Sequence, residues 1–286
     1  MSSPLYATHI DMQPRLVTDL ALARRLERAE GATNVAFVEA HARLAPESGA
    51  AWRNFDGTYA MFDGVDSPLT QAFGIGLFTP PTHDQLAEIE AYFAKRGAPV
   101  VHETSPLADP VLLSLLPDRG YRPVDQTSVL YRELAPVAST ASAGGLTVRR
   151  IDRGEEELWS ETSALGWSEI PEIAEFMRVF GLVCANSTGT HCFLAEDNGT
   201  AVAAGALAIH GGVGLLAGAS TRPEWRGKGA QAALLAARLS YALQQGCEVA
   251  LMGAQPGSGS QRNAERQGFR IGYTRTKWQL TRRPDA

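Results

Sequence analysis

The sequence predicts an α/β protein built as two tandem domains, and three observations support this prediction. The chain has 286 residues, which is enough for two domains of about 100–200 residues each. Near its middle, residues 135–145 contain no charge and no large side chain except Val137, as is typical of a linker. Signals for helices and strands recur in the same order on both sides of this segment. We therefore expect domains at residues 1–134 and 146–286, joined by a linker at 135–145.

The first half begins with residues 16–45, which have the apolar periodicity of two amphipathic helices. Turn and breaker residues then divide the later part of this half into short elements. The expected order is a helix at 84–96 ending at Gly97, a strand at 99–102, a helix at 110–116, the pair Gly120-Tyr121 and a strand at 127–131.

The second half has a fuller pattern. Strands are expected at 146–151, 192–195, 201–209 and 213–219, and helices at 155–165, 171–184 and 228–245. A strand at 248–252, a helix at 261–267, the pair Gly268-Phe269 and a β-rich tail to Leu280 follow. The turn Asp197-Asn198-Gly199 is typical of a β-hairpin. Hairpin strands together with crossover helices predict a mixed sheet with helices on both faces.

Composition excludes several classes of function. A net charge of -5 gives no general basic field for nucleic acid or an anionic membrane, so any phosphate site must be local. No apolar run reaches the roughly 18 residues of a membrane span, and residues 1–15 do not resemble a secretory signal. The cysteines and histidines show no metal-ligand spacing, so we expect no metal and a cytoplasmic location.

The segment from Thr221 to Gln231 carries the most specific chemical signal. Gly227 and Gly229 allow a tight turn between a strand and a long helix, where free N–H groups and the helix dipole favour an anion. Arg226 and Lys228 add positive charge, so a diphosphate fits this place. A solvated surface loop is the simplest alternative.

A dinucleotide-binding fingerprint is the other alternative, because Gly227-x-Gly229-x-x-Ala232 satisfies its formal pattern. In that motif an acidic residue ends the next strand, whereas Glu248 begins its strand here. Several strands also precede the glycine loop. These two differences argue against a nicotinamide-dependent enzyme.

Arg226-Gly-Lys-Gly229-Ala resembles the acyl-CoA pyrophosphate loop of the GNAT superfamily of N-acyltransferases. Pro223-Glu-Trp225 resembles the Pro-Glu-Tyr that often introduces that loop, and Asn263 to Phe269 resembles the helix ending in Gly-Phe on the pantetheine side. The resemblance covers nearly all of residues 146–280. It implies two tandem GNAT-like domains, each a mixed, largely antiparallel sheet flanked by helices.

The resemblance also implies that acetyl-CoA is the co-substrate and assigns residues to it. The pyrophosphate would lie on Arg226, Gly227, Lys228, Gly229, Ala230 and Gln231, although Gln231 stands where the family has a small residue. Backbone groups of Ala219, Ser220 and Thr221 would bind pantetheine, together with Asn263 and Arg266. Arg266 is equally well explained as an exposed helix cation.

Catalytic residues are less clearly indicated. Glu169 and His210 are candidates for the general base, and Trp167 for a wall of the acceptor pocket. A loop charge and a polar turn residue are the simpler interpretations of Glu169 and His210. Ala264 replaces the tyrosine that usually returns a proton to the departing thiolate in the family, and the strand before the loop contains no acid.

The first domain is expected to be degenerate, because its equivalent loop, residues 79–84, contains two prolines and neither glycine nor arginine. Thr82 or Asp84 would cap the helix that follows. This domain could support the second, shape the acceptor pocket or associate with another copy as a homodimer. We expect an N-acetyltransferase acting on an amine of a small molecule; the alternative is an acyl-CoA-binding regulator or pseudoenzyme.

Overall fold

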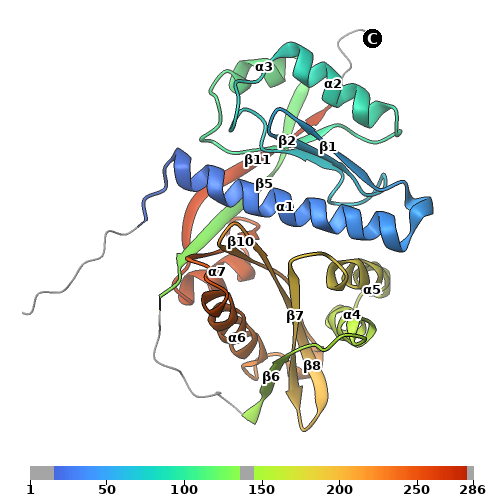
Figure 1. Ribbon diagram of the computed structural model, residues 1–286, viewed down its shortest axis with the longest axis vertical. Coiled ribbons are helices and arrows are strands. Elements are labelled where there is room, and N and C mark those ends of the chain that lie inside the picture. Colours follow the sequence, from blue (N-terminus) through green and yellow to red (C-terminus); the bar gives the residue numbers. More distant parts are fainter. Residues whose placement is uncertain (1–15, 136–144, 282–286) are drawn as a thin grey trace, which may run out of the picture.

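Strands from both halves of the chain form one open sheet of 11 strands in the computed structural model, which describes residues 16–135 and 145–281 (Figure 1). The first half contributes β1 (Ala51–Phe55), β2 (Thr58–Phe62), β3 (Gln71–Phe73), β4 (Val101–Thr104) and β5 (Tyr121–Glu133). The second half contributes β6 (Thr147–Arg150), β7 (Thr190–Asp197), β8 (Thr200–His210), β9 (Val213–Thr221), β10 (Val249–Ala254) and β11 (Arg270–Leu280). Their order across the sheet is β1-β2-β3-β4-β11-β5-β10-β9-β8-β7-β6.

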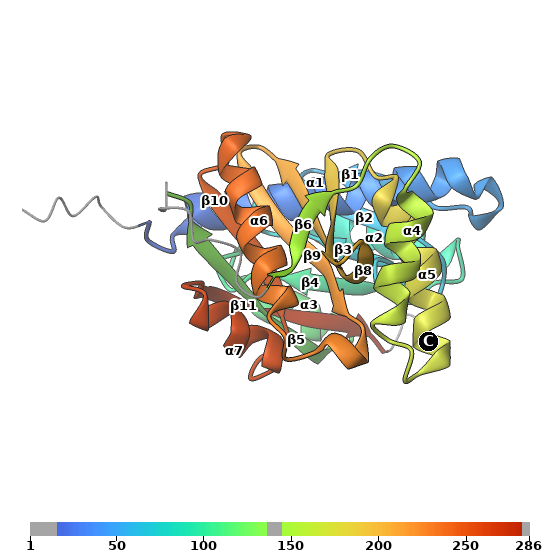
Figure 2. The same cartoon turned by 90° about the horizontal axis from the view of Figure 1, so that it is seen from below.

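Helices cover both faces of this sheet. They are α1 (Leu20–Leu44), α2 (His83–Ala94), α3 (Leu112–Asp118), α4 (Glu156–Leu165), α5 (Pro171–Ala185), α6 (Ala230–Gln244) and α7 (Gly259–Arg266). Figure 2 shows α6 on one side of the strands of the second half, with α4 and α5 on the other. In Figure 1, α1 crosses the middle of the molecule between the two halves. The predicted α/β class is therefore confirmed.

The internal repeat is also visible in the structure. Strands β1 to β5 correspond to β7 to β11, with β3 and β4 parallel around α2 and β9 and β10 parallel around α6. In the same way, α3 precedes β5 and α7 precedes β11. The domain boundaries remain a prediction, because most of the linker lies outside the described residues.

The last strand of each half is exchanged into the other half. Strand β11 pairs with β4 and β5, and β5 pairs with β10 and β11, all antiparallel. Trp278 of β11 therefore lies opposite His102 of β4, whereas Tyr131 of β5 lies opposite Leu251 of β10. The two halves share one continuous sheet, where the sequence had suggested one sheet for each.

Helix α1 corrects the prediction of two helices over residues 16–45. It is one helix of 25 residues that continues through Gly31. A Cβ atom on Gly31 would lie 2.8 Å from the Tyr59 ring, so the missing side chain lets α1 approach β2. Glycine weakens a helix but does not necessarily end it when tertiary contacts hold both sides.

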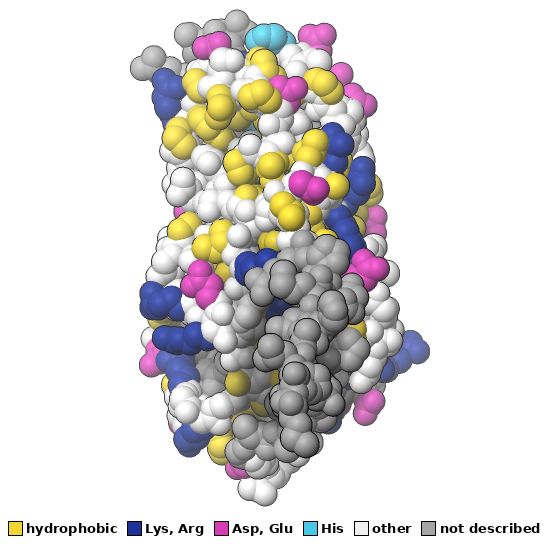
Figure 3. Space-filling view, turned by 90° about the vertical axis from the view of Figure 1, so that its left-hand side faces the viewer, with side chains coloured by type: hydrophobic (Ala, Val, Ile, Leu, Met, Phe, Trp, Pro, Cys, Tyr) yellow, Lys and Arg dark blue, Asp and Glu magenta, His cyan; other side chains and the backbone are white. Residues whose placement is uncertain are grey.

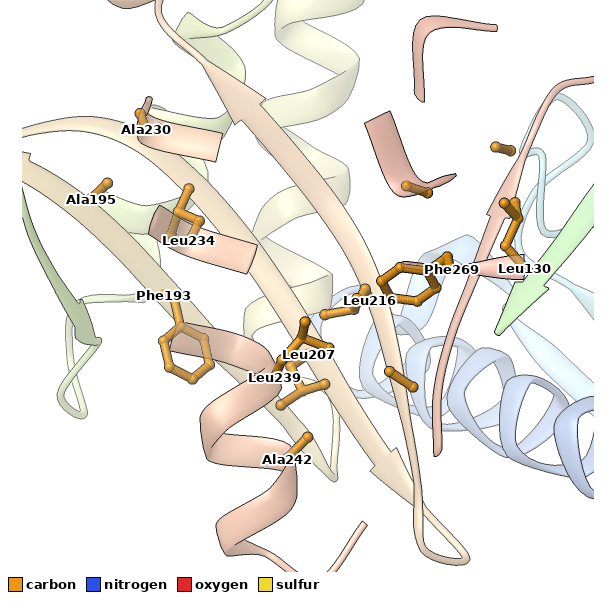
Figure 4. Close-up of a cluster of buried hydrophobic side chains, with 14 of the residues drawn as sticks. Leu130, Phe193, Ala195, Leu207, Leu216, Ala230, Leu234, Leu239, Ala242 and Phe269 are labelled. Atoms are coloured by element: carbon orange, nitrogen blue, oxygen red, sulfur yellow. The ribbon is translucent and has the colours of Figure 1, made fainter. Parts of the chain in front are cut away.

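The largest apolar cluster lies beneath α6 and combines both halves. Leu239 of α6 lies beside Leu207 of β8 (Figure 4), and Leu234 of α6 and Leu216 of β9 belong to the same cluster. Leu130 of the exchanged strand β5 belongs to the same cluster. Burial of apolar surface stabilises the folded state by about 25 cal/mol per Å². In this cluster the stabilisation therefore depends on residues from both sides of the linker.

A buried ionic cluster joins α1 to the sheet. Arg275 of β11 is 1% exposed and lies 3.0 Å from Glu30, 3.5 Å from Glu27 and 3.5 Å from Glu103 of β4. Tyr273 donates a hydrogen bond of 2.7 Å to Glu27. Burial is the main cause that raises the pKa of Glu27 to about 7.

Positive and negative side chains are mixed on the surface, as the modest net charge of the chain predicts. On the coloured part of the face in Figure 3, Lys and Arg side chains are interspersed with Asp and Glu side chains. Among the described helices, none is long and apolar enough to cross a membrane.

Candidate functional site

The two parallel strands of the second half separate at one end. Strands β9 and β10 pair only from Val213 to Leu215 and from Val249 to Leu251, although β9 continues to Thr221 and β10 to Ala254. Beyond the paired part, Ala217 and Ala219 of β9 are exposed. Exposure in the interior of an 11-stranded sheet shows that this end is open. It therefore offers free backbone groups to an extended ligand.

A bulge and a buried arginine shape the open part of β9. The register against β8 shifts between Ala204 and Ala206, and Gly218 in the bulge has a φ of 57°. Arg238 of α6 donates hydrogen bonds of 3.0 Å to the Ala206 carbonyl and 3.3 Å to the Ala217 carbonyl. Burial lowers its pKa to about 10. Arg238 thus holds the bulge at the point where β9 leaves β10.

The predicted phosphate loop lies at the end of β9. Gly227 and Gly229 have φ values of 76° and 84°, which favour glycine, and a Cβ atom on either would meet nothing within 4 Å. Gly229 is the N-cap of α6, and no side chain caps this helix. The N–H groups of its first turn are consequently available to an anion, which the helix dipole also favours.

Arg226 is held by the connection between α4 and α5. Its Nη1 lies 2.5 Å from Oε2 of Glu169, and its Nη2 donates to the Gly166 carbonyl at 2.9 Å. Gly166 itself approaches β9 closely, because a Cβ atom there would lie 2.6 Å from that of Ser220. This contact fixes the α4–α5 connection beside the loop.

The remaining loop residues are arranged differently from Arg226. The Lys228 ammonium lies 4.3 Å from the centre of the Trp225 ring, a cation–π contact. The Gln231 side-chain amide donates to the Ser220 carbonyl at 2.8 Å and to Thr221 Oγ1 at 2.7 Å. Gln231 therefore ties the start of α6 to the end of β9, which a smaller residue could not do.

Helix α7 carries the second motif. Asn263 and Arg266 are both exposed, and Arg266 donates a hydrogen bond of 3.2 Å to the Asn263 side chain. Ala264 is 2% exposed and belongs to the core cluster under α6. Position 264 thus faces the core and carries no group that could donate a proton.

The candidate catalytic and acceptor-pocket residues lie in two different parts of the structure. Glu169 lies beside the loop, paired with Arg226, and Trp167 is exposed in the same α4–α5 connection. His210 pairs with Val213 at the beginning of β9, whereas the loop follows Thr221 at the other end. The structure therefore brings Glu169 and Trp167 to the site and leaves His210 far from it.

The corresponding helix start of the first half is capped by a side chain. Thr82 caps α2, and its side-chain oxygen accepts a hydrogen bond of 3.1 Å from the Gln85 N–H. The expectation that residue 82 or 84 caps the helix is met by Thr82. The capped α2 contrasts with the uncapped α6 at the equivalent position.

Sequence reasoning missed Arg238 and the exchanged strand β5 beside β10. An arginine among the apolar residues of a helix was the available signal for Arg238. In the described part of the chain, no group of three or more His, Cys, Asp or Glu side chains could hold a metal ion.

Comparison with known proteins agrees with this geometry. The model of the acetyltransferase (GNAT) family matches residues 153–269. No curated protein matches the sequence. The chain is similar in structure to a GCN5-related N-acetyltransferase from Kribbella flavida, with 20% identity, a TM-score of 0.60 and coverage of 87% of this chain and 96% of that one.

A tandem GNAT protein from the clavulanic acid biosynthesis pathway is also similar, with 13% identity and a TM-score of 0.57. That match covers 92% of this chain and 96% of the other. Identities this low show a shared fold alone. The family match to residues 153–269 confirms the resemblance first seen in the loop.

Proposed function

We propose that the chain is an N-acetyltransferase using acetyl-CoA and a small-molecule amine, on the premise that residues 153–269 match the model of the acetyltransferase (GNAT) family. The single observation that carries the proposal is the uncapped start of α6, at Gly229, beside the open end of β9. A diphosphate can accept hydrogen bonds from the first turn of that helix while an extended arm follows the strand. Lys228 and Arg226 supply the local positive charge.

The residues around the open strands fit the rest of this co-substrate. Exposed backbone at Ala217 and Ala219 can bind the pantetheine amides, and Asn263 on α7 can do so from the other side. When bound, acetyl-CoA would supply a thioester carbonyl to an attacking amine. The nitrogen–carbon bond forms, the carbon–sulfur bond breaks, and the amine proton must pass to a base.

We assign the role of base to Glu169. A diphosphate on the loop would compete with Glu169 for Arg226, and this ion pair is easily released because its two side chains are 49% and 61% exposed. Exposed pairs of this kind contribute only about 0.2–1 kcal/mol. Release would leave the carboxylate free beside Trp167, where an acceptor amine could reach it.

An acyl-CoA-binding regulator without efficient transfer is the second candidate. Ala264 favours it, because this position is buried in the core and offers no acid to the departing thiolate. The two candidates differ in one measurement, the release of CoA thiol in the presence of amines. Tight acetyl-CoA binding without thiol release from any amine would identify the regulator.

Thermal unfolding with excess acetyl-CoA tests the binding site. A ligand at about 100 times its Kd stabilises the folded state by about 2.7 kcal/mol, which raises Tm measurably. We expect the shift to disappear in Arg226→Glu and to persist in the control Arg53→Glu, a charge reversal at an exposed position of β1. Absence of a shift in the unmodified protein, or an equal shift with NADH, would contradict the proposal.

A further inference from the structure

Arg238 is a buried cation without an acidic partner. It lies among the apolar residues of α6 and is 3% exposed. Helix α6 and the two strands that its guanidinium contacts, β8 and β9, contain no aspartate or glutamate. Among the described residues, no carboxylate forms an ion pair with Arg238. A buried charge without a counter-ion is strongly destabilising, so this place favours an anion.

The Arg238 guanidinium also has a donor without a protein partner. Its Nε donates to the Leu234 carbonyl at 3.2 Å, and its Nη1 donates to the carbonyls of Ala206 and Ala217. Within the part of the chain that the structure describes, Nη2 donates to no protein group. It is not enclosed either, because the fully buried nitrogens that lack a partner include two of Arg275 but none of Arg238. Nη2 is therefore open to a ligand.

Nη2 lies at the open end of β9. It is bonded to the same carbon as Nη1, which holds the carbonyl of the exposed residue Ala217. On β8, Gly205 makes room for the guanidinium, since a Cβ atom there would lie 2.9 Å from Cζ of Arg238. At this level β9 has already left β10, because their pairing ends at Leu215. Nη2 is thus beside the gap in which the backbone of β9 is free.

The length of the pantetheine arm brings its sulfur to the same level. The Gln231 amide joins Thr221 Oγ1 to the start of α6, so a diphosphate on that helix lies beside Thr221. Pantetheine has about 12 bonds between its phosphoester oxygen and its sulfur, as many as about four extended residues, and so spans roughly 13 Å. Four residues before Thr221 on β9 is Ala217, whose carbonyl Arg238 holds. An extended arm along β9 would therefore end at Arg238.

We propose that Arg238 is a further catalytic residue, which stabilises the CoA thiolate as it leaves the acetyl group. This inference rests on the proposed function for its chemistry. The amine nitrogen bonds to the carbonyl carbon, its proton passes to Glu169, and the carbon–sulfur bond breaks with both electrons moving to sulfur. The guanidinium is charged at neutral pH, since burial lowers its pKa only to about 10. The protein then needs no acid at position 264, because the sulfur leaves as an anion and takes its proton from water.

Other charged groups near α6 have partners or positions of their own. The acidic and basic residues of β6, β7 and β8, which pack against α6 together with β9, are Arg149, Arg150, His191, Glu196, Asp197 and His210. Arg149 pairs with Glu196. Arg150 and His191 contact Tyr241 on α6. Asp197 and His210 lie at the two ends of β8, opposite Thr200 and Val213.

The ionisation of bound CoA tests the role of Arg238 without an acceptor amine. The full chain is saturated with CoA that carries carbon-13 next to the sulfur, and the chemical shift of that carbon is followed against pH. An opposite charge within about 4–6 Å lowers a pKa by about 1–3, so we expect the pKa of the bound thiol to lie at least about one below that of free CoA. A bound thiol whose pKa equals or exceeds that of free CoA would overturn the proposal.

Two variants assign the lowered thiol pKa to Arg238. Arg238→Gln keeps hydrogen-bond donors for the two carbonyls but removes the charge, so the pKa of the bound thiol should return to that of free CoA. Arg238→Lys keeps the charge and should retain most of the effect. A merely structural role would change Tm or CoA affinity and leave the thiol pKa as it is in the unmodified protein. A lowered thiol pKa that persists in Arg238→Gln would thus overturn the assignment.

Lys228→Gln is the matched control. It removes a cation at the diphosphate end of the arm, roughly 13 Å from the sulfur and beyond the Debye length of about 8–10 Å. It should therefore weaken CoA binding and leave the pKa of the bound thiol unchanged. An equal rise of the thiol pKa in Lys228→Gln and Arg238→Gln would show a general effect of positive charge and overturn the specific role of Arg238.

The same measurements separate this inference from the proposed function. CoA binding with an unshifted thiol pKa, together with thiol release from acetyl-CoA by an amine, would preserve the transferase and remove the role of Arg238. A lowered thiol pKa without thiol release by any amine would remove the transferase and leave Arg238 as a CoA-binding residue. A chain that does not bind CoA would overturn both.

Discussion

At the scale of single residues, the pairing of Glu169 with Arg226 has opposite consequences for binding and for catalysis. Glu169→Gln removes the carboxylate that competes with the diphosphate, so we expect acetyl-CoA to bind about two- to fivefold more tightly, as release of an exposed ion pair allows. Acetyl transfer should fall at least about 100-fold if Glu169 is the base. Calorimetry and a thiol-release assay measure the two effects. A variant that binds and transfers as the unmodified protein does would exclude both roles.

Burial of Glu27 makes the stability of the protein depend on pH. Its pKa in the folded protein, about 7, is above the ordinary value of 4.5, so the folded state retains a proton that the unfolded chain has lost. The contribution of Glu27 to stability is therefore complete below about pH 4.5 and is lost as the pH rises to about 7. Urea unfolding of Glu27→Gln should show a smaller fall in stability over this range than the unmodified protein. The same fall in both proteins would show that Glu27 is not the cause.

The sequence indicated some of these residues and not others. The sequence predicts a role for Arg226, Gly227 and Gly229 because they lie together in the chain and a diphosphate loop requires that spacing. The partner of Arg226 could not be identified, because Glu169 is far away in the sequence and only the α4–α5 connection brings it close. The sequence shows that position 264 carries no acidic group, but its burial in the core depends on how α7 packs.

At the scale of elements, most helices and strands followed from local patterns, and α1 shows where such patterns are insufficient. Its central glycine has a tertiary function, the close approach to Tyr59, which no local pattern reveals. We expect Gly31→Ala to destabilise the protein by about 1–3 kcal/mol despite the better helix propensity of alanine, because its Cβ would overlap the ring. Urea unfolding measures this loss, and Tyr59→Val in the same chain should recover part of it. A stabilised Gly31→Ala would show that α1 lies farther from β2.

At the scale of the whole molecule, the exchange of β5 and β11 means that neither half is complete alone. Residues 1–140 and 141–286, expressed separately, should each lack cooperative unfolding, because each lacks a central strand of its part of the sheet. Expressed together, they should form a one-to-one complex that unfolds cooperatively and binds acetyl-CoA. Circular dichroism and sedimentation measure these outcomes. A folded, acetyl-CoA-binding fragment 141–286 would contradict the importance of the exchange.

The repeat predicted the order of helices and strands within each half, but it did not predict that the last strands of the two halves are exchanged. The last strands of the two halves, β5 and β11, occupy equivalent places in the repeat, since each follows a short helix and a Gly-aromatic pair. Local alternation shows which residues of a strand are buried, but it does not show which neighbour the strand pairs with. Strand order therefore had to come from the three-dimensional structure.

The position of β11 also has a consequence for synthesis of the chain on the ribosome. This strand, residues 270–280, is made after all the other described helices and strands, and it lies between two strands of the first half. The first half must consequently wait with the facing edges of β4 and β5 unpaired until β11 has emerged from the ribosome. A premature stop codon shortly before residue 270 would thus leave both halves unfinished, and exposed strand edges of this kind are recognised by chaperones and prone to aggregation.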